Sequence, residues 1–227
     1  MHRALLLIGL GTSLLAGAAC GGQPTGPLAV AAAGNDVDLV HALLHDQHDD
    51  PNGRDAYGMT PLMWAARTGA VDGMRALLDG GADPLAYDRR NGWTALFHAI
   101  HKRRTAAVRL LLDRGVNPNR YAGMLSPLAM AAADHDPAIV HLLLAHGADV
   151  KARGLGGSTA LSVAVSGGAL TDLDRPLLGG CHPATVRALL THDPTLRLPD
   201  SIAGHEAIWW AKFHGCDEVL KLVKGAA

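Results

Sequence analysis

A seven-residue pattern that recurs through the chain constrains the fold more than any other feature. The segment TPLMWAA at residues 60–66 returns in related form from residues 94, 126 and 159, at spacings of 34, 32 and 33 residues. Weaker copies begin at residues 26 and 206. Self-similarity at a fixed period of this length is typical of one supersecondary unit that is repeated and stacked, because a single unit cannot bury its apolar face alone.

A second pattern keeps phase with the first and closes each unit. It reads LLDGGADP at 77–84, LLDRGVNP at 111–118 and LLAHGADV at 143–150. A Thr or Ser before the first apolar run can cap a helix, and Pro suits its first turn. The paired Leu residues supply the buried face of a second helix, and the Gly after them suits a left-handed helix end. Each unit is therefore predicted to hold two helices.

Together the two patterns resemble those of the ankyrin-repeat family, T-P-L-H-x-A at the first helix and L-L-x-x-G-A-D at the end of the second. The resemblance implies an all-α solenoid of about six helix-turn-helix repeats with short hairpin fingers between them. We place this domain at residues 26–225, with repeats near 26–55, 56–88, 89–121, 122–153, 154–198 and 199–225. The fifth repeat is long and is predicted to contain an insertion at 169–182.

One family residue is missing from every repeat. The position of the family's His holds Ala29, Met63, Phe97, Ala129, Ser162 and Trp209. We therefore expect apolar packing where the family has a polar network at the start of the first helix.

The first residues have the composition of an export signal. A short basic start and an apolar run make residues 1–19 a predicted signal peptide, and residues 20–25 a lipidated flexible spacer. The sequence LLAGAAC resembles the bacterial lipobox, which implies acylation of Cys20, although Gly17 stands where that pattern usually has Leu. Conventional cleavage nearby is the alternative. Because Gly21 is not Asp, the resemblance implies the outer membrane of a Gram-negative bacterium, facing the periplasm.

Charge and motifs argue against several classes of function. Lys and Arg number 20 against 21 Asp and Glu, so no overall positive field attracts nucleic acid. No nucleophile, zinc-ligand or phosphate-loop motif lies in a suitable context. We expect no enzymatic activity, no cofactor and no small-molecule substrate, and contact with a membrane only through the lipid anchor.

Two cysteines remain if Cys20 is acylated. Cys181 lies in the insertion and Cys216 lies beside Gly215 in the next repeat. An exported protein meets an oxidising compartment, so we predict a disulfide between them. Two free buried thiols are the alternative, because sequence does not give the separation of the Cα atoms.

The family resemblance also implies a binding face. Ankyrin proteins usually bind partners on the concave side, built from the fingers and the ends of the first helices. Carried over position by position, this gives Tyr57, Met59, Arg67, Tyr87, Arg89, Arg90, Trp93, His101, Lys102, Tyr121, Phe213 and His214. Arg with Tyr or Trp is the composition of interface hot spots, so the expected partner is another protein with an acidic patch.

The sequence therefore predicts an extracytoplasmic protein-interaction scaffold. Small exported ankyrin lipoproteins resemble proteins found beside secreted antibacterial toxins, which implies a role as an immunity protein. The alternative is a periplasmic metal-handling or envelope stress protein that uses clustered His. His41 and His45 lie one turn apart on a predicted second helix, with His48 just beyond. However, the equivalents of His41 are also cationic or His, which favours a solvent-facing row.

Overall fold

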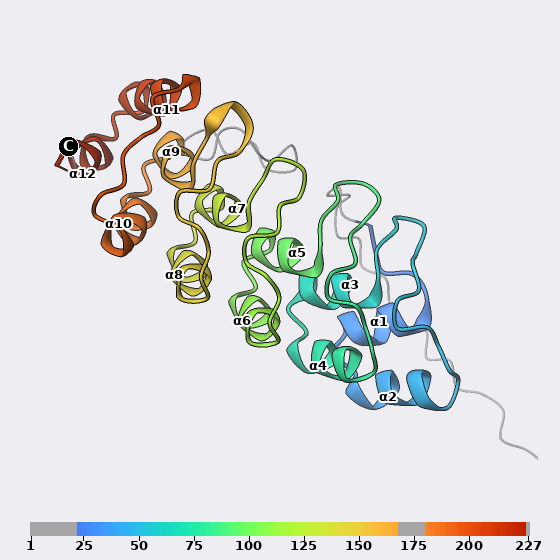
Figure 1. The fold of residues 1–227 in the computed structure, drawn as a ribbon. Helices are drawn as coiled ribbons and strands as arrows, with labels where there is room; N and C mark the ends of the chain where they lie inside the picture. Colours follow the sequence, from blue (N-terminus) through green and yellow to red (C-terminus); the bar gives the residue numbers. More distant parts are fainter. Residues whose placement is uncertain (1–21, 168–179, 226–227) are drawn as a thin grey trace, which may run out of the picture.

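The computed structural model describes residues 22–167 and 180–225. The predicted signal peptide, Cys20 and residues 169–179 of the predicted insertion lie outside these ranges. The described residues form twelve α-helices in six antiparallel pairs, which confirms the all-α solenoid (Figure 1). The first helices of the pairs are α1 Pro27–Ala33, α3 Pro61–Thr68, α5 Ala95–His101, α7 Pro127–Ala133, α9 Ala160–Ser166 and α11 Ile202–Phe213.

The second helices form a row beside the first. They are α2 Val37–His45, α4 Val71–Asp79, α6 Thr105–Asp113, α8 Pro137–Ala145, α10 Pro183–His192 and α12 Asp217–Gly225. A short 3-10 turn, η1 Leu155–Gly157, precedes α9. Each first helix packs on the next first helix, and each second helix on the next second helix. The chain between pairs projects as a row of fingers (Figure 1).

Local chemistry explains where the first helices begin. The hydroxyl groups of Thr60, Ser126 and Thr159 accept hydrogen bonds from backbone N–H groups in the first turns of α3, α7 and α9. Thr94 makes no such bond before α5, so capping is not uniform. Side-chain caps stabilise a helix by about 1 kcal/mol each because they satisfy an otherwise unpaired N–H.

The core runs the length of the stack between the two rows of helices. The recurring Ala of the first helices is fully buried at each repeat, which lets neighbouring helices approach closely. The first-helix Leu and the paired Leu of the second helix fill the space around it, with Leu77, Leu111, Leu143 and Leu189 all buried. This packing supplies the stability that a single pair of short helices lacks.

Candidate functional site

The fingers before α3 and α5 lie against each other and are held by one arginine. Arg54 Nη1 donates to the carbonyl oxygen of Gly58 in its own finger at 2.8 Å and to that of Tyr87 in the next at 2.5 Å. The Arg54 guanidinium also lies over the Tyr87 ring, 5.8 Å from its centroid. Gly58 has a φ of 75°, and a Cβ there would lie 2.7 Å from Arg89 Cγ. Glycine therefore allows the close approach that places Arg89 beside the finger of repeat two.

A buried carboxylate shapes the finger of repeat three. Asp88 Oδ1 accepts hydrogen bonds from the backbone N–H groups of Arg90, Asn91 and Gly92, at 3.0, 2.6 and 3.1 Å. Its other oxygen, Oδ2, lies 2.9 Å from Nε2 of His98 on α5. With the carboxylate turned inward, the finger folds around it and the side chains of Arg89 and Arg90 are exposed to solvent.

The protonation states of this buried pair follow from its surroundings. Burial opposes ionisation of Asp88, but the hydrogen bonds from His98 and the finger backbone outweigh it, so the pKa of this carboxyl is lowered. Burial lowers the pKa of His98 below its ordinary value, even though Asp88 favours the charged ring. A neutral His98 therefore donates its Nε2–H to an ionised Asp88.

The preceding finger repeats this arrangement with a different donor. Trp64 Nε1 on α3 donates to Asp55 Oδ2 at 2.7 Å, and Asp55 Oδ1 accepts from the backbone N–H groups of Tyr57 and Met59. The expectation of purely apolar packing at the start of the first helices is therefore wrong for repeats two and three. The donors, Trp64 and His98, each lie one residue after the position of the family's His, so the absence of His from that position does not reveal them.

Asparagine side chains connect two pairs of adjacent finger loops. Asn52 donates to the carbonyl oxygen of Gly81 at 3.2 Å and accepts from the N–H of Asp83 at 2.7 Å. Asn119 makes the same two bonds to Gly147 and Asp149, at 2.9 and 2.7 Å. These bonds satisfy backbone groups that would otherwise need water, and they fix the spacing between fingers.

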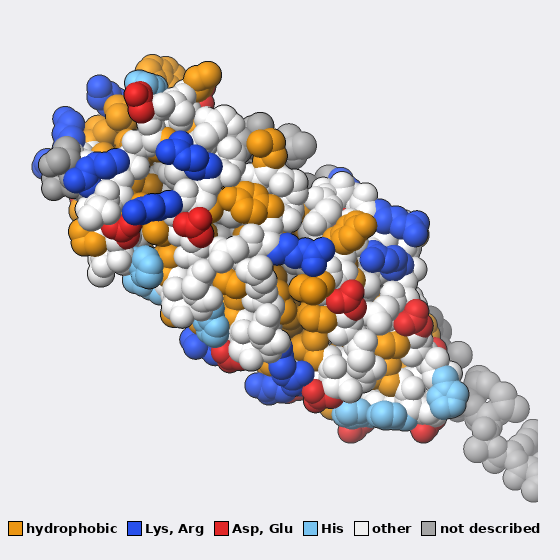
Figure 2. All heavy atoms as spheres, viewed as in Figure 1, with side chains coloured by type: hydrophobic (Ala, Val, Ile, Leu, Met, Phe, Trp, Pro, Cys, Tyr) orange, Lys and Arg blue, Asp and Glu red, His pale blue; other side chains and the backbone are white. Residues whose placement is uncertain are grey.

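The exposed tips of the fingers are basic and aromatic. Tyr57, Tyr87 and Tyr121 are exposed, and Trp93 is partly exposed. Arg89 and Arg90 are exposed, and among the described residues their guanidinium groups have no hydrogen-bond or ion-pair partner. Figure 2 shows Lys and Arg side chains gathered where these fingers lie. We call the six residues Arg54, Tyr57, Tyr87, Arg89, Arg90 and Trp93 the finger surface.

Several residues expected on the binding face lie elsewhere. Met59 is only 7% exposed and His101 only 2%, so neither contacts a partner directly, and both assignments are wrong. His101 lies at the end of a first helix, but the stack covers it and the Trp93 ring lies 5.1 Å from its own. Arg67 and Lys102 are partly buried and make contacts within the protein.

The remaining expected residues do not join the finger surface. Phe213 and His214 lie at the end of α11, at the far end of the stack from α3 (Figure 1). The Tyr121 hydroxyl donates to the carbonyl oxygen of Arg153 at 3.1 Å and so connects the fingers before α7 and α9.

Reasoning from the sequence alone missed Arg54 and Asp88. The 33-residue spacing of Arg54, Tyr87, Arg120 and Arg153 is a signal that would have placed Arg54 among the fingers.

Comparison with known families agrees with this geometry. A family model described as ankyrin repeats, in three copies, matches residues 28–122, and a model of a single ankyrin repeat matches residues 125–155. Together these matches cover more than half of the chain.

The chain belongs to the ankyrin-repeat family.

No curated protein matches it closely enough to count as a relative. Ankyrin repeats are, in general, non-enzymatic scaffolds for protein–protein interaction, and we assign this protein to that broad class.

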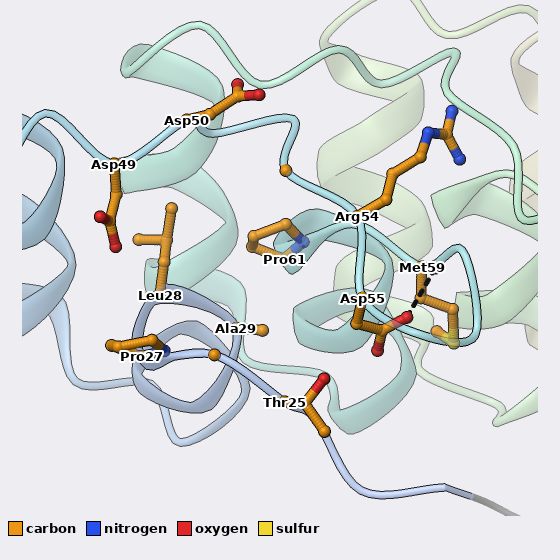
Figure 3. Close-up of a pocket in the computed structure, with 12 residues that line it drawn as sticks. Thr25, Pro27, Leu28, Ala29, Asp49, Asp50, Arg54, Asp55, Met59 and Pro61 are labelled. Atoms are coloured by element: carbon orange, nitrogen blue, oxygen red, sulfur yellow. Dashed lines mark hydrogen bonds between the residues drawn. The ribbon is translucent and has the colours of Figure 1, made fainter.

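A pocket of about 250 Å³ lies between the start of α1 and the first finger of the ankyrin array (Figure 3). Pro27, Leu28 and Pro61 give it an apolar floor, and Asp49 and Asp55 lie at its edge. Asp55 already accepts hydrogen bonds from two backbone N–H groups and from an indole. Because its carboxylate is engaged in shaping the finger, we place the candidate site on the finger surface rather than in this pocket.

The His residues suggested as metal ligands lie on the second-helix side. The rings of His41 and His45 stack with centroids 6.0 Å apart. Within residues 22–167 and 180–225, no group of three or more His, Cys, Asp or Glu is arranged to hold a metal ion. The equivalents of His41 are all exposed, as expected for a solvent-facing row: Arg75, Arg109, His141, Arg187 and Lys221. In the same ranges, no helix is long and apolar enough to cross a membrane.

The two C-terminal repeats of the array are joined covalently. Cys181, just before α10, forms a disulfide with Cys216, just before α12, and their Cα atoms are 5.2 Å apart. The structure thus contains the pair expected from the sequence. The bond fixes the start of the second helix of repeat five to the turn of repeat six.

Proposed function

We propose that this ankyrin protein binds an acidic patch on another protein through its finger surface. The observation that carries the proposal is the exposure of Arg89 and Arg90 on a finger that the buried Asp88 holds in shape. A preformed finger loses little conformational entropy on binding, so more of the interaction energy appears as affinity. Unpartnered guanidinium groups form bidentate bonds with carboxylates, and nearby Tyr rings supply contact area.

Binding is proposed to take place outside the cytoplasm. The sequence of residues 1–19 supports export, and acylation of Cys20 would anchor the protein to the outer membrane on its periplasmic side. A disulfide between Cys181 and Cys216 is consistent with an oxidising compartment. Mass spectrometry of the membrane-extracted protein tests the anchor: an acylated Cys at the mature N-terminus is expected, and an unmodified N-terminus would refute it.

The narrower form of the proposal is that the partner is a secreted antibacterial toxin and this chain is its immunity protein. The resemblance of small exported ankyrin lipoproteins to such proteins supports this form. Co-expression of a candidate toxin in the periplasm tests it. The ankyrin protein should restore growth, and the variant with Arg89 and Arg90 replaced should not; a partner without toxicity would refute the narrower form but leave the broader one standing.

Affinity capture from an envelope extract tests the broader form. The double variant Arg89→Ser/Arg90→Ser should lose a stoichiometric partner that the wild-type protein retains, because it removes both free cations from one finger. The matched control is Arg109→Ser/Lys221→Ser, which removes the same charge from exposed positions on α6 and α12.

The control should retain the partner, and raising the salt concentration should weaken capture by the wild-type protein. Equal loss of the partner in both variants would mean that net charge, not the finger surface, determines binding. Retention of the partner by both variants would refute the finger surface as the binding site.

A further inference from the structure

The segment that precedes α1 lies along the first finger. Thr25 lines the same pocket as Asp55 of that finger, and Figure 3 shows the two residues next to each other. Nearer the N-terminus, Gly22 is half-buried against the ring of Tyr57, because a Cβ on Gly22 would lie only 2.6 Å from Tyr57 Cε2. Glycine permits this close approach. The described chain therefore begins beside the exposed tip of the finger of repeat two.

Further contacts connect this point to the cations of the finger surface. Gly58 follows Tyr57 in the chain, and a Cβ on Gly58 would lie 2.7 Å from Arg89 Cγ in the next finger. The hydrogen bonds of Arg54 hold the same two fingers together. A continuous row of contacts thus runs from Gly22 through the first finger to Arg89. The segment before α1 and the finger surface meet at one place on the molecule.

The distance between this place and the proposed lipid anchor is short. Cys20 precedes Gly22 by two residues. Two residues of fully extended chain span only about 7 Å, so a lipid on Cys20 must enter the bilayer close to the Tyr57 ring. A long flexible linker would let the domain take any position above the membrane. A tether of two residues instead keeps the finger of repeat two at the membrane surface.

We propose that the lipid anchor holds the finger surface at the membrane surface, where it binds an acidic patch on a protein of the same membrane. This inference rests on the proposed function, both for the acylation of Cys20 and for the acidic partner.

The residues at this place suit the position. Tyr57 has an apolar ring with a polar tip, a combination that is enriched where membrane meets water. The long side chain of Arg89 can pack its stem against apolar surface while its charged end stays hydrated. Two proteins confined to one surface also meet at a higher effective concentration than in free solution, so a contact of modest area is enough for binding.

Fluorescence quenching in vesicles tests the position of the finger. The full-length acylated protein is reconstituted into phosphatidylethanolamine–phosphatidylglycerol vesicles that contain lipids with a nitroxide on the headgroup. Bimane is attached at Ala56→Cys, an exposed position beside Tyr57, or at Arg75→Cys, an exposed position on α4 of the same repeat. The first helix of the repeat lies between these positions (Figure 1). Because a helix is about 10 Å thick and nitroxide quenching is short-ranged, the finger label should be quenched about threefold more strongly.

A longer tether is the matched control. Insertion of twenty Gly and Ser residues after Gly21 keeps the acylated Cys20 but allows a separation of about 25 Å between anchor and finger, so the two labels should then be quenched equally. A difference that persists would mean that the finger binds lipid by itself, which would overturn the role of the anchor. Equal quenching with the natural tether would overturn the proposal, and so would a Cys20 that carries no lipid.

The location of the partner is a second measurement, and it separates this inference from the proposed function. The partner that Arg89→Ser/Arg90→Ser loses should be extracted from washed membranes by detergent and be absent from the soluble periplasmic fraction. A partner that this variant loses but that is soluble would overturn the inference and leave the proposed function standing. Retention of the partner by the variant would refute the proposed function and with it the partner named here, whereas the quenching result would still report the position of the finger.

Discussion

Replacing Asp88 by Ala is expected to lower the free energy of unfolding by about 4 kcal/mol and to loosen the finger of repeat three. Loss of Oδ2 leaves the Nε2–H of His98 buried without an acceptor, which costs about 2 kcal/mol. Loss of Oδ1 removes the acceptor for three finger N–H groups. These lie near solvent and recover water, so their loss adds about 2 kcal/mol rather than the full cost of three charged hydrogen bonds.

Asp88→Asn is the matched variant, because it keeps the shape of the side chain and an oxygen acceptor for the finger. Its amide group would meet Nε2 of His98, which can accept once the ring proton moves to Nδ1. That nitrogen is buried and has no hydrogen-bond partner, so the shift leaves one N–H unsatisfied. We therefore expect Asn to cost about 1–2 kcal/mol, clearly less than Ala.

Urea denaturation followed by Trp fluorescence measures both changes, since the Trp93 ring lies 5.5 Å from that of His98. Amide hydrogen exchange at Arg90, Asn91 and Gly92 should speed up in the Ala variant and remain slower in the Asn variant. A loss below about 1 kcal/mol for Ala, or equal losses for Ala and Asn, would refute the assigned role of the carboxylate.

Three further changes test other parts of the array. Cys181→Ser opens a covalent link between residues 35 positions apart and should lower the stability of the C-terminal repeats by about 3–4 kcal/mol, read from urea midpoints; no change would contradict the disulfide. Burial and a neighbouring imidazole lower the pKa of His135 to about 4, and solvent screens part of this effect because the ring is only partly buried. Stability should therefore fall by about 1–2 kcal/mol as the pH drops from 6.5 to 4, where the unfolded chain binds a proton that the folded one does not. His135→Gln should flatten this acid limb in pH-dependent denaturation, and an unchanged limb would count against it. Gly73→Ala should destabilise the fold by at least about 1 kcal/mol despite the better helix propensity of Ala, because its Cβ would lie 2.7 Å from the carbonyl oxygen of Ala32. Thermal melting measures this change. In the same measurement Gly80→Ala should be better tolerated, since the closest contact of its Cβ would be the end of the flexible Leu44 side chain, and the nearest backbone atom, the carbonyl oxygen of Ala76, would lie 3.2 Å away.

The candidate site was only partly predictable, and the reason is packing. Position in the repeat correctly placed Tyr57, Tyr87 and Arg89 on the fingers, because finger residues follow the period of the array. The same reasoning failed for His101, which occupies an equivalent position at the end of a first helix but is covered by its neighbours. The equivalent residues Ala133 and Ser166 are buried as well, so burial at this position comes from the repeats that pack together, and no single repeat contains the information.

The sequence by itself determined the number of repeats, the two helices in each and the Gly positions at the helix ends, since these follow from local propensity and a recurring apolar pattern. Only the tertiary structure decided that Asp55 and Asp88 turn inward to a Trp and a His on the next helix, and that His101 is covered. Local patterns are fixed by neighbours along the chain, whereas burial and hydrogen bonding depend on which repeats meet in space.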